Sequence, residues 1–368
     1  MGMNMPALLE KAYAGRTVIV TGDTGFKGSW LSIWLHRLGA KVVGLALPPR
    51  TAQDNYVVCG LDGKNSHVDG DIRDYGVVQE VMAEFRPSIV FHMAAQALVL
   101  ESYAEPLGTF QTNILGTANV LEAIRHATGV KAAVMVASDK CYENRELVHG
   151  YRESDALGGR DPYSASKGAS EIVTSSYTRS FFTGRGAPGI ASVRAGNVLG
   201  GGDWSPNRIV PDCVRALRQN EPIIVRNPEA VRPWQHVLEP LHGYLKLGAL
   251  LMKDKKAYSG PWNFGPTHRN QVTVRRLVET VIRRWGSGEY RVHKGAGGRE
   301  ACLLALDISK AANLLKWWPA LDFETTVRFA VEEYKFAGKG PDRFFGQRVR
   351  QIDRYMKRRS AMEGGADE

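Results

Sequence analysis

The chain has 368 residues, of which 43% are hydrophobic and 23% are charged, and its formal net charge at pH 7 is +10. This composition excludes a wholly disordered protein, and no apolar run reaches the roughly 18 residues that a membrane-spanning helix requires. The lysines and arginines are dispersed, which favours an anionic small-molecule ligand over a nucleic acid. Four cysteines without a CxxC pair predict free thiols in a cytoplasmic protein and no metal site.

Short apolar runs alternate with longer amphipathic stretches in the first half of the chain. The predicted strands are 17–21, 41–47, 88–92, 132–138 and 189–194, and the predicted helices are 29–38, 75–85, 106–127 and 164–182. Because these strands are apolar at nearly every position, we expect a parallel sheet that is covered by helices on both faces. The sustained alternation predicts a doubly wound, Rossmann-type α/β fold.

After Arg194 the predicted elements become shorter, and proline, tryptophan and arginine become more frequent. We therefore expect a dinucleotide-binding domain over residues 1–200, with a returning segment near 236–260 that includes a helix at 238–251. A smaller C-terminal α/β lobe for the substrate is expected mainly over 201–345, with helices at 273–286 and 321–336. Residues 346–368 are expected to form a C-terminal tail.

A glycine-rich loop, Thr21-Gly22-Asp23-Thr24-Gly25-Phe26-Lys27-Gly28, stands between the first predicted strand and the first predicted helix. Glycines at this point let the backbone turn tightly and approach a pyrophosphate, whose charge is received at the helix N-terminus. The GxxGxxG spacing is typical of short-chain and extended oxidoreductases. The loop therefore predicts a dinucleotide cofactor held by Gly22, Thr24, Gly25, Phe26, Lys27 and Gly28.

The carboxylate expected after the second strand, where it would hold the adenosine ribose, is missing. Arg50 follows that strand and suits a 2′-phosphate, which weakens the choice of NAD over NADP. The remaining cofactor residues are expected at the ends of later strands: Asp71 and Ile72 after the third, and Ala94, Ala95 and Gln96 after the fourth.

The segment Asp161–Lys167 contains a YxxxK pattern within a predicted helix. Residues four apart lie on one face of a helix, so Tyr163 and Lys167 are expected to share one site. A nearby ammonium favours the phenolate and lowers the tyrosine pKa, so the phenol becomes able to exchange a proton with a substrate hydroxyl.

With these motifs in place, the chain resembles the nucleotide-sugar 4,6-dehydratase group of extended short-chain dehydrogenases/reductases, and within it most closely the CDP-glucose 4,6-dehydratases. The segments that carry the resemblance are TGDTGFKGSWL (21–31), GDIRD (70–74), FHMAAQ (91–96), SDKCYENRE (138–146), DPYSASKG (161–168), RAGNVLGGGDW (194–204), RNPEAVRPWQHVLEPL (226–241) and WNFGP (262–266). SDKCYEN and RPWQHVLEP are more specific than the fold motifs.

The resemblance implies NAD as the cofactor and CDP-glucose as the substrate. In the implied reaction, Tyr163 takes the proton of the sugar O4 while C4 is oxidised. Water is then lost across C5 and C6, and hydride return to C6 gives a 4-keto-6-deoxy sugar. The cofactor is regenerated in every cycle, and the product would feed deoxysugar synthesis for a surface polysaccharide such as the O-antigen of lipopolysaccharide.

The resemblance also implies roles for three residues after the fifth strand. Ser138 would steady O4, and Asp139 would protonate the departing O6. Lys140 stands where the dTDP-glucose enzymes have a glutamate base. It would either remove the C5 proton, which requires a lowered pKa, or remain charged and stabilise the enolate.

Further residues are implied at the ligands: Asn113 at the cofactor, and Gln96, Asn197, Arg208, Arg232 and Arg299 at the substrate. Two segments depart from the family pattern, because 97–101 lacks an expected proline and arginine and 301–305 is more apolar than expected. His92 and His236 are interpreted as core histidines. A homodimer is expected through helices 106–127 and 164–182.

Alternatives to this function remain open. Within the same fold they are another nucleotide-sugar dehydratase or a 4-epimerase, which needs neither an acid for O6 nor a base for C5. From other functional classes they are a catalytically silent NAD-binding regulator or scaffold and a nucleic-acid-binding protein, for which binding would depend steeply on salt.

Overall fold

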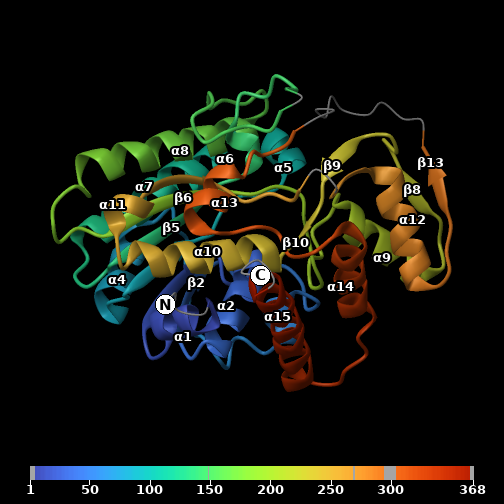
Figure 1. Ribbon diagram of the computed structural model, residues 1–368, viewed down its shortest axis with the longest axis horizontal. Coiled ribbons are helices and arrows are strands. Elements are labelled where there is room, and N and C mark those ends of the chain that lie inside the picture. Colours follow the sequence, from blue (N-terminus) through green and yellow to red (C-terminus); the bar gives the residue numbers. More distant parts are fainter. Residues whose placement is uncertain (1–4, 148, 268–269, 294–303, 365–368) are drawn as a thin grey trace.

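The computed structural model describes residues 5–147, 149–267, 270–293 and 304–364, and a parallel sheet lies at its centre (Figure 1). Within these residues the sheet has seven strands in the order β11-β6-β5-β4-β1-β2-β3. The strands are β1 (Thr17–Thr21), β2 (Lys41–Ala46), β3 (Ser66–Asp69), β4 (Ile89–His92), β5 (Ala132–Val136), β6 (Gly189–Arg194) and β11 (Gly260–Asn263). Strand order reverses between β1 and β4, which is the point where open α/β sheets bind ligands.

Helices cover both faces of the sheet, as its apolar strands require (Figure 1). One face is covered by α1 (Met5–Tyr13), α2 (Phe26–Arg37), α10 (Leu238–Leu251) and α15 (Pro341–Gly364). The other face is covered by α4 (Tyr75–Phe85), α7 (Gly116–His126) and α8 (Pro162–Ser180). In β1, Val18 and Val20 join the first hydrophobic core and Ile19 joins the second, because successive side chains of a strand alternate between its faces.

A smaller lobe lies beside the carboxyl edge of the sheet, at the right of Figure 1. There β8 (Ile223–Val225) pairs with β13 (Tyr290–Val292), and β9 (Val231–Pro233) pairs with β12 (Gln271–Thr273). Helices α9 (Ile209–Gln219), α12 (Val274–Trp285) and α14 (Phe323–Lys335) pack around these ribbons over a separate core. The short strands β7 (Val198–Leu199) and β10 (Gln235–His236) pair where the chain passes between the two parts.

Shorter helical elements complete the structure: α3 (Asn55–Val58), α5 (Val99–Ala104), α6 (Pro106–Phe110), the π-helical turn η1 (Gln111–Leu115), the 3₁₀ turn η2 (Asp139–Cys141), α11 (Lys255–Tyr258) and α13 (Ser309–Leu315). No helix in the described part of the chain combines the length and the apolarity needed to cross a membrane. The described cysteines, Cys59, Cys141 and Cys213, are free and buried, whereas Cys302 lies outside the described residues.

The predicted α/β fold is confirmed, and the predicted strands differ from the observed ones by at most two residues at an end. Three elements differ from the expectations. The predicted helix 106–127 is divided into α6, η1 and α7. Residues 260–263, expected in the smaller lobe, form β11 and pair with β6 in the main sheet.

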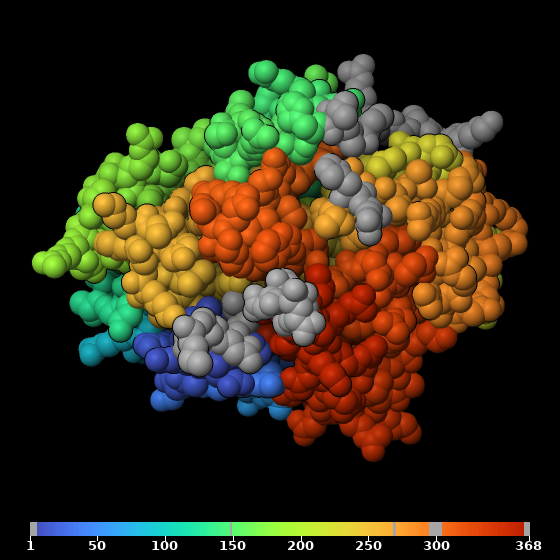
Figure 2. Space-filling view, in the orientation of Figure 1, coloured from blue at the N-terminus to red at the C-terminus, as the bar shows by residue number. Residues whose placement is uncertain are grey.

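The segment expected as a tail is instead the helix α15, which packs against α2, α3 and α14. Figure 2 shows this red segment filling the surface between the blue N-terminal helices and the orange smaller lobe. Arg348 donates to the buried Asn55 at 2.8 Å, and the Tyr355 hydroxyl donates to the buried Glu239 at 2.8 Å. The segment is rich in arginine, so its sequence does not look like that of a core element. Buried polar partners such as Asn55 and Glu239 allow it to pack against the core.

Candidate active site

The glycine loop after β1 is shaped by close backbone contacts. Gly22 has φ +75°, and a Cβ atom there would lie 2.7 Å from the amide nitrogen of Ala94. A Cβ atom on Gly28 would lie 2.0 Å from the carbonyl oxygen of Gly22, so only glycine lets α2 start this close to the loop. The Thr24 hydroxyl donates to the carbonyl of Leu47 at 2.9 Å, which fixes the loop to the end of β2.

The N-terminus of α2 is built to receive an anion. The helix begins at Phe26, and its cap residue Gly25 is extended and offers no side chain to the first N–H groups. Such groups bind phosphate, and Lys27 adds a cation in the first turn. The cradle therefore fits the pyrophosphate of a dinucleotide.

One carboxylate in this loop was missed by the sequence reasoning. Asp23 is fully buried and accepts hydrogen bonds from Asn65 at 2.9 Å and from His67 at 3.0 Å. It lies against Gly44 of β2, where a Cβ atom would stand 1.9 Å from its oxygen. The Asp23 hydrogen bond raises the pKa of His67, although burial partly opposes it. The only signal in the sequence is that an acidic residue stands between the first two glycines of the loop.

The residues predicted at the adenosine end are engaged with their neighbours. The Asp71 carboxylate accepts from the Arg73 side chain at 2.8 Å and from its backbone N–H at 2.9 Å. Ile72 is buried in front of Gly116, and the N–H of Ala94 donates to the Thr21 hydroxyl at 3.2 Å.

Gln96 and Asn113 organise the loop that leaves β4. The Gln96 side chain hydrogen-bonds the backbone of Leu98 in both directions, and it donates to Thr109 at 2.9 Å. Asn113, in the π-helical turn, exchanges hydrogen bonds with the Gln96 backbone and donates to Ser166 at 2.8 Å. The two amides therefore connect this loop to α8, and the Gln96 side chain faces its own loop.

Tyr163 and Lys167 are both buried on α8, as the four-residue spacing predicts. The carboxylate of Asp161 caps this helix, and the Tyr163 N–H donates to the buried Ser102 hydroxyl of α5 at 3.1 Å. Burial raises the pKa of Tyr163 to about 12, and a hydrogen bond with Ser138 acts in the opposite direction. Burial also lowers the pKa of Lys167 to about 8. The expectation that the nearby ammonium lowers the pKa of Tyr163 is wrong for the chain alone, because burial disfavours the charged forms of both Tyr163 and Lys167.

Ser138, Asp139 and Lys140 lie at the end of β5 beside the tyrosine, in and just before the turn η2. The Ser138 hydroxyl donates to Asp139 at 2.9 Å, and the Asp139 side chain packs against Gly196, where a Cβ atom would be 1.8 Å from its oxygen. Asp139 is 4% exposed, whereas Lys140 is exposed. The protein alone therefore does not shield the Lys140 side chain from water.

Cations line the same region from other elements. Burial lowers the pKa of Lys27 to about 8, the positive charges of Arg208 and Lys167 act in the same direction, and the carboxylates of Asp139 and Asp203 oppose them. Arg208 donates to the buried Asp203 at 2.8 Å. Lys27, Lys167 and Arg208 are thus available as cationic donors to phosphate oxygens, with Asp203 already holding Arg208.

The remaining predicted substrate residues are not all brought together. Asn197 follows β6 with φ +42°, and its carbonyl accepts from Gln235. Arg232 lies in β9 of the smaller lobe, where it pairs in register with Val272. Arg299 lies outside the described residues.

Both histidines are core residues, as expected. His92 is buried between the hydroxyls of Thr21 and Thr117, at 2.8 and 3.1 Å. His236 packs edge-on against Trp30 and Phe329, and burial lowers the pKa of each histidine to about 3.

A buried polar network behind α8 was also missed. Arg194 of β6 pairs with Glu171 of α8 at 2.9 Å, and it donates to the Tyr142 hydroxyl at 2.7 Å. Tyr142 in turn donates to Asn263 of β11 at 2.8 Å. The network ties α8 to β6 and β11, one helical turn beyond Lys167.

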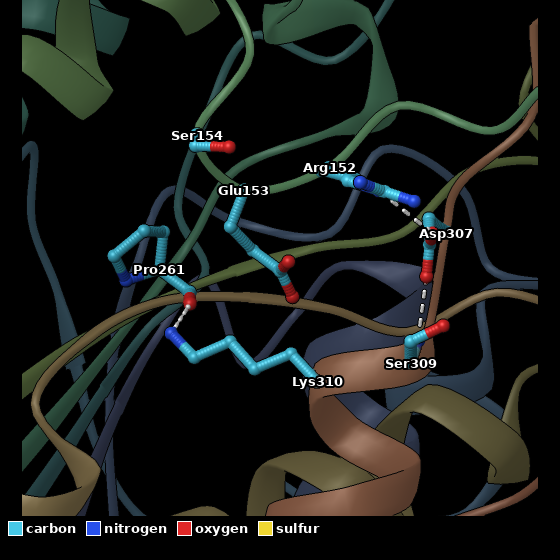
Figure 3. A pocket seen from close by; sticks show the side chains of 7 residues that line it. All are labelled: Arg152, Glu153, Ser154, Pro261, Asp307, Ser309 and Lys310. Atoms are coloured by element: carbon cyan, nitrogen blue, oxygen red, sulfur yellow. Dashed lines mark hydrogen bonds and ion pairs between the residues drawn. The ribbon is translucent and has the colours of Figure 1, made fainter.

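A cavity of about 430 Å³ lies at the outer end of this network (Figure 3). Its lining residues are Arg152, Glu153, Ser154, Pro261, Asp307, Ser309 and Lys310. Figure 3 shows the Glu153 carboxylate between the Arg152–Asp307 pair and Lys310, which donates to the Pro261 carbonyl at 2.7 Å. None of these residues belongs to the predicted catalytic or cofactor set, so this cavity is separate from the candidate active site.

Comparisons with solved structures agree with the observed fold. A dTDP-glucose 4,6-dehydratase from Streptomyces venezuelae, solved with NAD bound, has a TM-score of 0.73 and 24% identity, and covers 86% of this chain and 96% of its own. A UDP-glucose 4-epimerase from Thermus thermophilus, solved with NAD, has a TM-score of 0.72 and 25% identity, and covers 88% of this chain and 100% of its own.

Comparisons of sequence are more specific. The profile of the family described as GDP-mannose 4,6 dehydratase matches residues 19–329. A CDP-glucose 4,6-dehydratase of Salmonella typhimurium is 44% identical over 350 residues, which are 94% of this chain and 97% of that enzyme. A dTDP-glucose 4,6-dehydratase of Streptomyces antibioticus is 31% identical over 86% of this chain and 92% of its own. The resemblance seen in the motifs is confirmed, and the chain belongs to the nucleotide-sugar 4,6-dehydratase family of extended short-chain dehydrogenases/reductases.

Proposed function

We propose that this enzyme converts CDP-glucose to CDP-4-keto-6-deoxyglucose and uses NAD as a resident cofactor. The observation that carries the proposal is the 44% identity to a CDP-glucose 4,6-dehydratase over nearly the whole of both chains. The grouping of Ser138, Asp139 and Lys140 beside Tyr163 supports it, because a dehydratase needs groups for O4, O6 and C5 together.

The cofactor proposal rests on the cradle at the first βα turn. A dinucleotide pyrophosphate suits this turn for three reasons. The N-terminus of α2 has no side-chain cap, the backbone at Gly22 lies close to that of Ala94 with no side chain between them, and Lys27 supplies a cation. When bound, NAD would supply a reversible oxidant for C4 that is restored when C6 is reduced.

Tyr163 is the proposed base for the O4 proton, with Ser138 holding the same oxygen. A pKa of about 12 means that the phenol is protonated in the chain alone. The positive charge of the oxidised cofactor and of Lys167 would both favour the phenolate, so Tyr163 is expected to become a base only in the loaded enzyme.

Asp139 is the proposed acid for the departing O6, because its carboxyl group is buried at the end of β5 beside Ser138 and Tyr163. Lys140 is the proposed group at C5. It acts as a base if substrate and cofactor exclude water from it, and as a cationic stabiliser of the enolate if it remains hydrated.

For the substrate, Arg208 beside Lys27 and Lys167 is proposed to hold the diphosphate, together with Asn197, Arg232 and Arg299. Guanidinium groups suit this task because their fork donates two bonds to phosphate oxygens. The side chain of Gln96 is directed into its own loop, so its proposed contribution to the cofactor and substrate is to fix that loop.

We also propose a homodimer through the helices around α8. Large apolar side chains are exposed on neighbouring elements there: Leu107 of α6 at 68%, Leu115 of η1 at 58% and Ile172 of α8 at 59%. Such a group of exposed apolar residues is typical of a protein–protein interface, and a second copy of the chain would cover it.

The test is to incubate the purified enzyme with CDP-glucose and to measure the near-ultraviolet absorbance of a 4-keto sugar in alkali. UDP-glucose, dTDP-glucose and GDP-mannose serve as matched substrates. Product from CDP-glucose supports the proposal, whereas recovery of only a 4-epimer would reject it. Mass spectrometry of small molecules released on denaturation identifies the resident cofactor.

A further inference from the structure

Arg50 and Glu101 form a two-point ion pair between loops that leave different strands. Arg50 lies just after β2, and its two terminal nitrogens are 3.3 and 3.4 Å from the two carboxylate oxygens of Glu101 in α5. Both side chains are exposed, Arg50 at 64% and Glu101 at 39%, and the guanidinium fork faces the carboxylate.

The strand order places this pair across the cofactor cradle. β2 and β4 lie on opposite sides of β1, and the glycine loop stands at the carboxyl end of β1. A link between the loop after β2 and the helix after β4 therefore spans the end of β1. A dinucleotide whose pyrophosphate lies on the glycine loop runs along this edge from the β2 side to the β4 side, and it has to pass beneath the link.

The α5 side of the link is anchored to the catalytic helix. Ser102, the residue after Glu101, is fully buried, and its hydroxyl accepts the hydrogen bond from the Tyr163 N–H. Glu101 is thus presented from a helix that is anchored to α8, and Arg50 approaches it from the loop after β2.

Arg50 was the sequence candidate for a ligand of an adenosine 2′-phosphate. In the structure both of its terminal nitrogens are committed to Glu101, whose negative charge also repels a phosphate at this position. The arginine that could favour NADP is therefore paired with a carboxylate from the other side of β1.

We propose that the Arg50–Glu101 pair is a clasp that retains the dinucleotide between turnovers and selects NAD over NADP. The inference rests on the proposed use of NAD and goes beyond it by assigning retention and selectivity to two residues outside the catalytic set. Retention of the dinucleotide does not slow turnover, because the proposed reaction restores the oxidised cofactor in every cycle.

The test measures the rate of NAD release from the purified holoenzyme after rapid dilution into an excess of a competing dinucleotide. Arg50→Glu and Glu101→Arg each place like charges across the groove and should speed release by about two- to ten-fold. The double charge swap, Arg50→Glu with Glu101→Arg, restores the attraction and should return the rate to within about two-fold of the original. Arg354→Glu is the matched control, since it breaks a similarly exposed pair with Glu332 away from the groove, and release should be unchanged.

Selectivity is read from equilibrium binding of NAD and NADP to the apo-enzyme by calorimetry. Glu101→Gln releases Arg50 and should strengthen NADP binding relative to NAD. Arg50→Ala should weaken retention of NAD without this gain.

Unchanged release in both single variants, or a double swap no better than the worse single variant, would overturn the clasp. A loss of NADP binding alone in Arg50→Ala would also overturn it, because Arg50 would then bind the 2′-phosphate directly. These outcomes presuppose an enzyme that holds NAD. A wild-type protein that neither contains nor binds NAD instead contradicts the proposed function itself.

Discussion

Arg194 and Glu171 form an ion pair at 2.9 Å whose side chains are each only 3% exposed. The pair joins β6 to the helix that carries Tyr163 and Lys167. Glu171 also accepts the Ser192 hydroxyl at 2.7 Å, so its oxygens are satisfied within the protein. The position of α8 therefore depends on charges that water does not reach.

We expect Arg194→Met to lower the free energy of unfolding by about 3–5 kcal/mol, because it leaves the Glu171 carboxylate buried without its cation. Urea denaturation followed by circular dichroism measures the change. Arg354→Met, at a surface pair, should cost less than about 1 kcal/mol. Equal costs for the two variants would mean that the buried pair has no special role.

Tyr163→Phe should lower the rate of CDP-4-keto-6-deoxyglucose formation by at least about 100-fold, because the proton of O4 then has no acceptor. The thermal transition and the amount of bound NAD should be unchanged. Tyr103→Phe, on the exposed surface of α5, is the matched control and should retain full activity. Substantial activity in the first variant would exclude Tyr163 as the base.

Lys140→Met should separate the two halves of the proposed reaction. Oxidation at C4 does not need Lys140, so absorbance of the reduced cofactor near 340 nm should accumulate on adding CDP-glucose, as expected for roughly single-turnover chemistry. Exchange of the C5 proton with solvent deuterium should be slowed by at least about 100-fold. Normal exchange at C5 would assign the elimination to another group.

Lys140→Arg distinguishes the two roles of this residue. Arginine keeps the charge and cannot act as a base, so retained exchange at C5 indicates stabilisation of the enolate. Loss of exchange indicates that Lys140 removes the proton.

His67 should make stability depend on pH through its contact with Asp23. Its pKa is raised in the folded protein, so its contribution is fully present below the unfolded pKa of roughly 6.5 and is lost as pH rises through the folded value. The stability advantage of the wild type over His67→Gln should therefore be larger at about pH 5.5 than at about pH 8.5. Denaturant titrations at both pH values measure it, and Asp23→Asn should reduce the same dependence. An advantage that grows with pH would contradict this assignment.

Leu107→Glu or Ile172→Glu should dissociate the proposed homodimer, because a carboxylate would be buried in an apolar interface. Sedimentation velocity at micromolar protein reports the change in mass. Leu314→Glu, an equally exposed leucine on α13, should leave the assembly unchanged. A wild-type chain that sediments as a monomer would refute the dimer.

The local patterns of the sequence were sufficient for the fold and for part of the site. Strand β1 could be predicted because Thr17–Thr21 is apolar on both faces, and Tyr163 and Lys167 could be paired because four residues make about one helical turn. Ser138 and Asp139 were predicted as site residues from the family motif and from the rule that ligands bind at the ends of parallel strands, and their roles stay a prediction.

The remaining features depend on contacts that no local pattern encodes. Asp23 hydrogen-bonds His67 of β3, and Arg194 of β6 hydrogen-bonds Glu171 of α8. Arg348 hydrogen-bonds Asn55, which is distant from it in the sequence. The pKa of Tyr163 was predicted in the wrong direction for the chain alone, because the motif indicates the neighbouring cation but not the extent of burial.

The contacts of α15 have a consequence for the order of events during biosynthesis. Asn55 and Glu239 are each 1% exposed. Asn55 accepts a hydrogen bond from Arg348, which is translated 293 residues later, and Glu239 accepts one from Tyr355, which is translated 116 residues later. These two hydrogen bonds cannot form until α15 has been translated, so the nascent Rossmann unit is expected to acquire its final packing only after residue 355 has emerged.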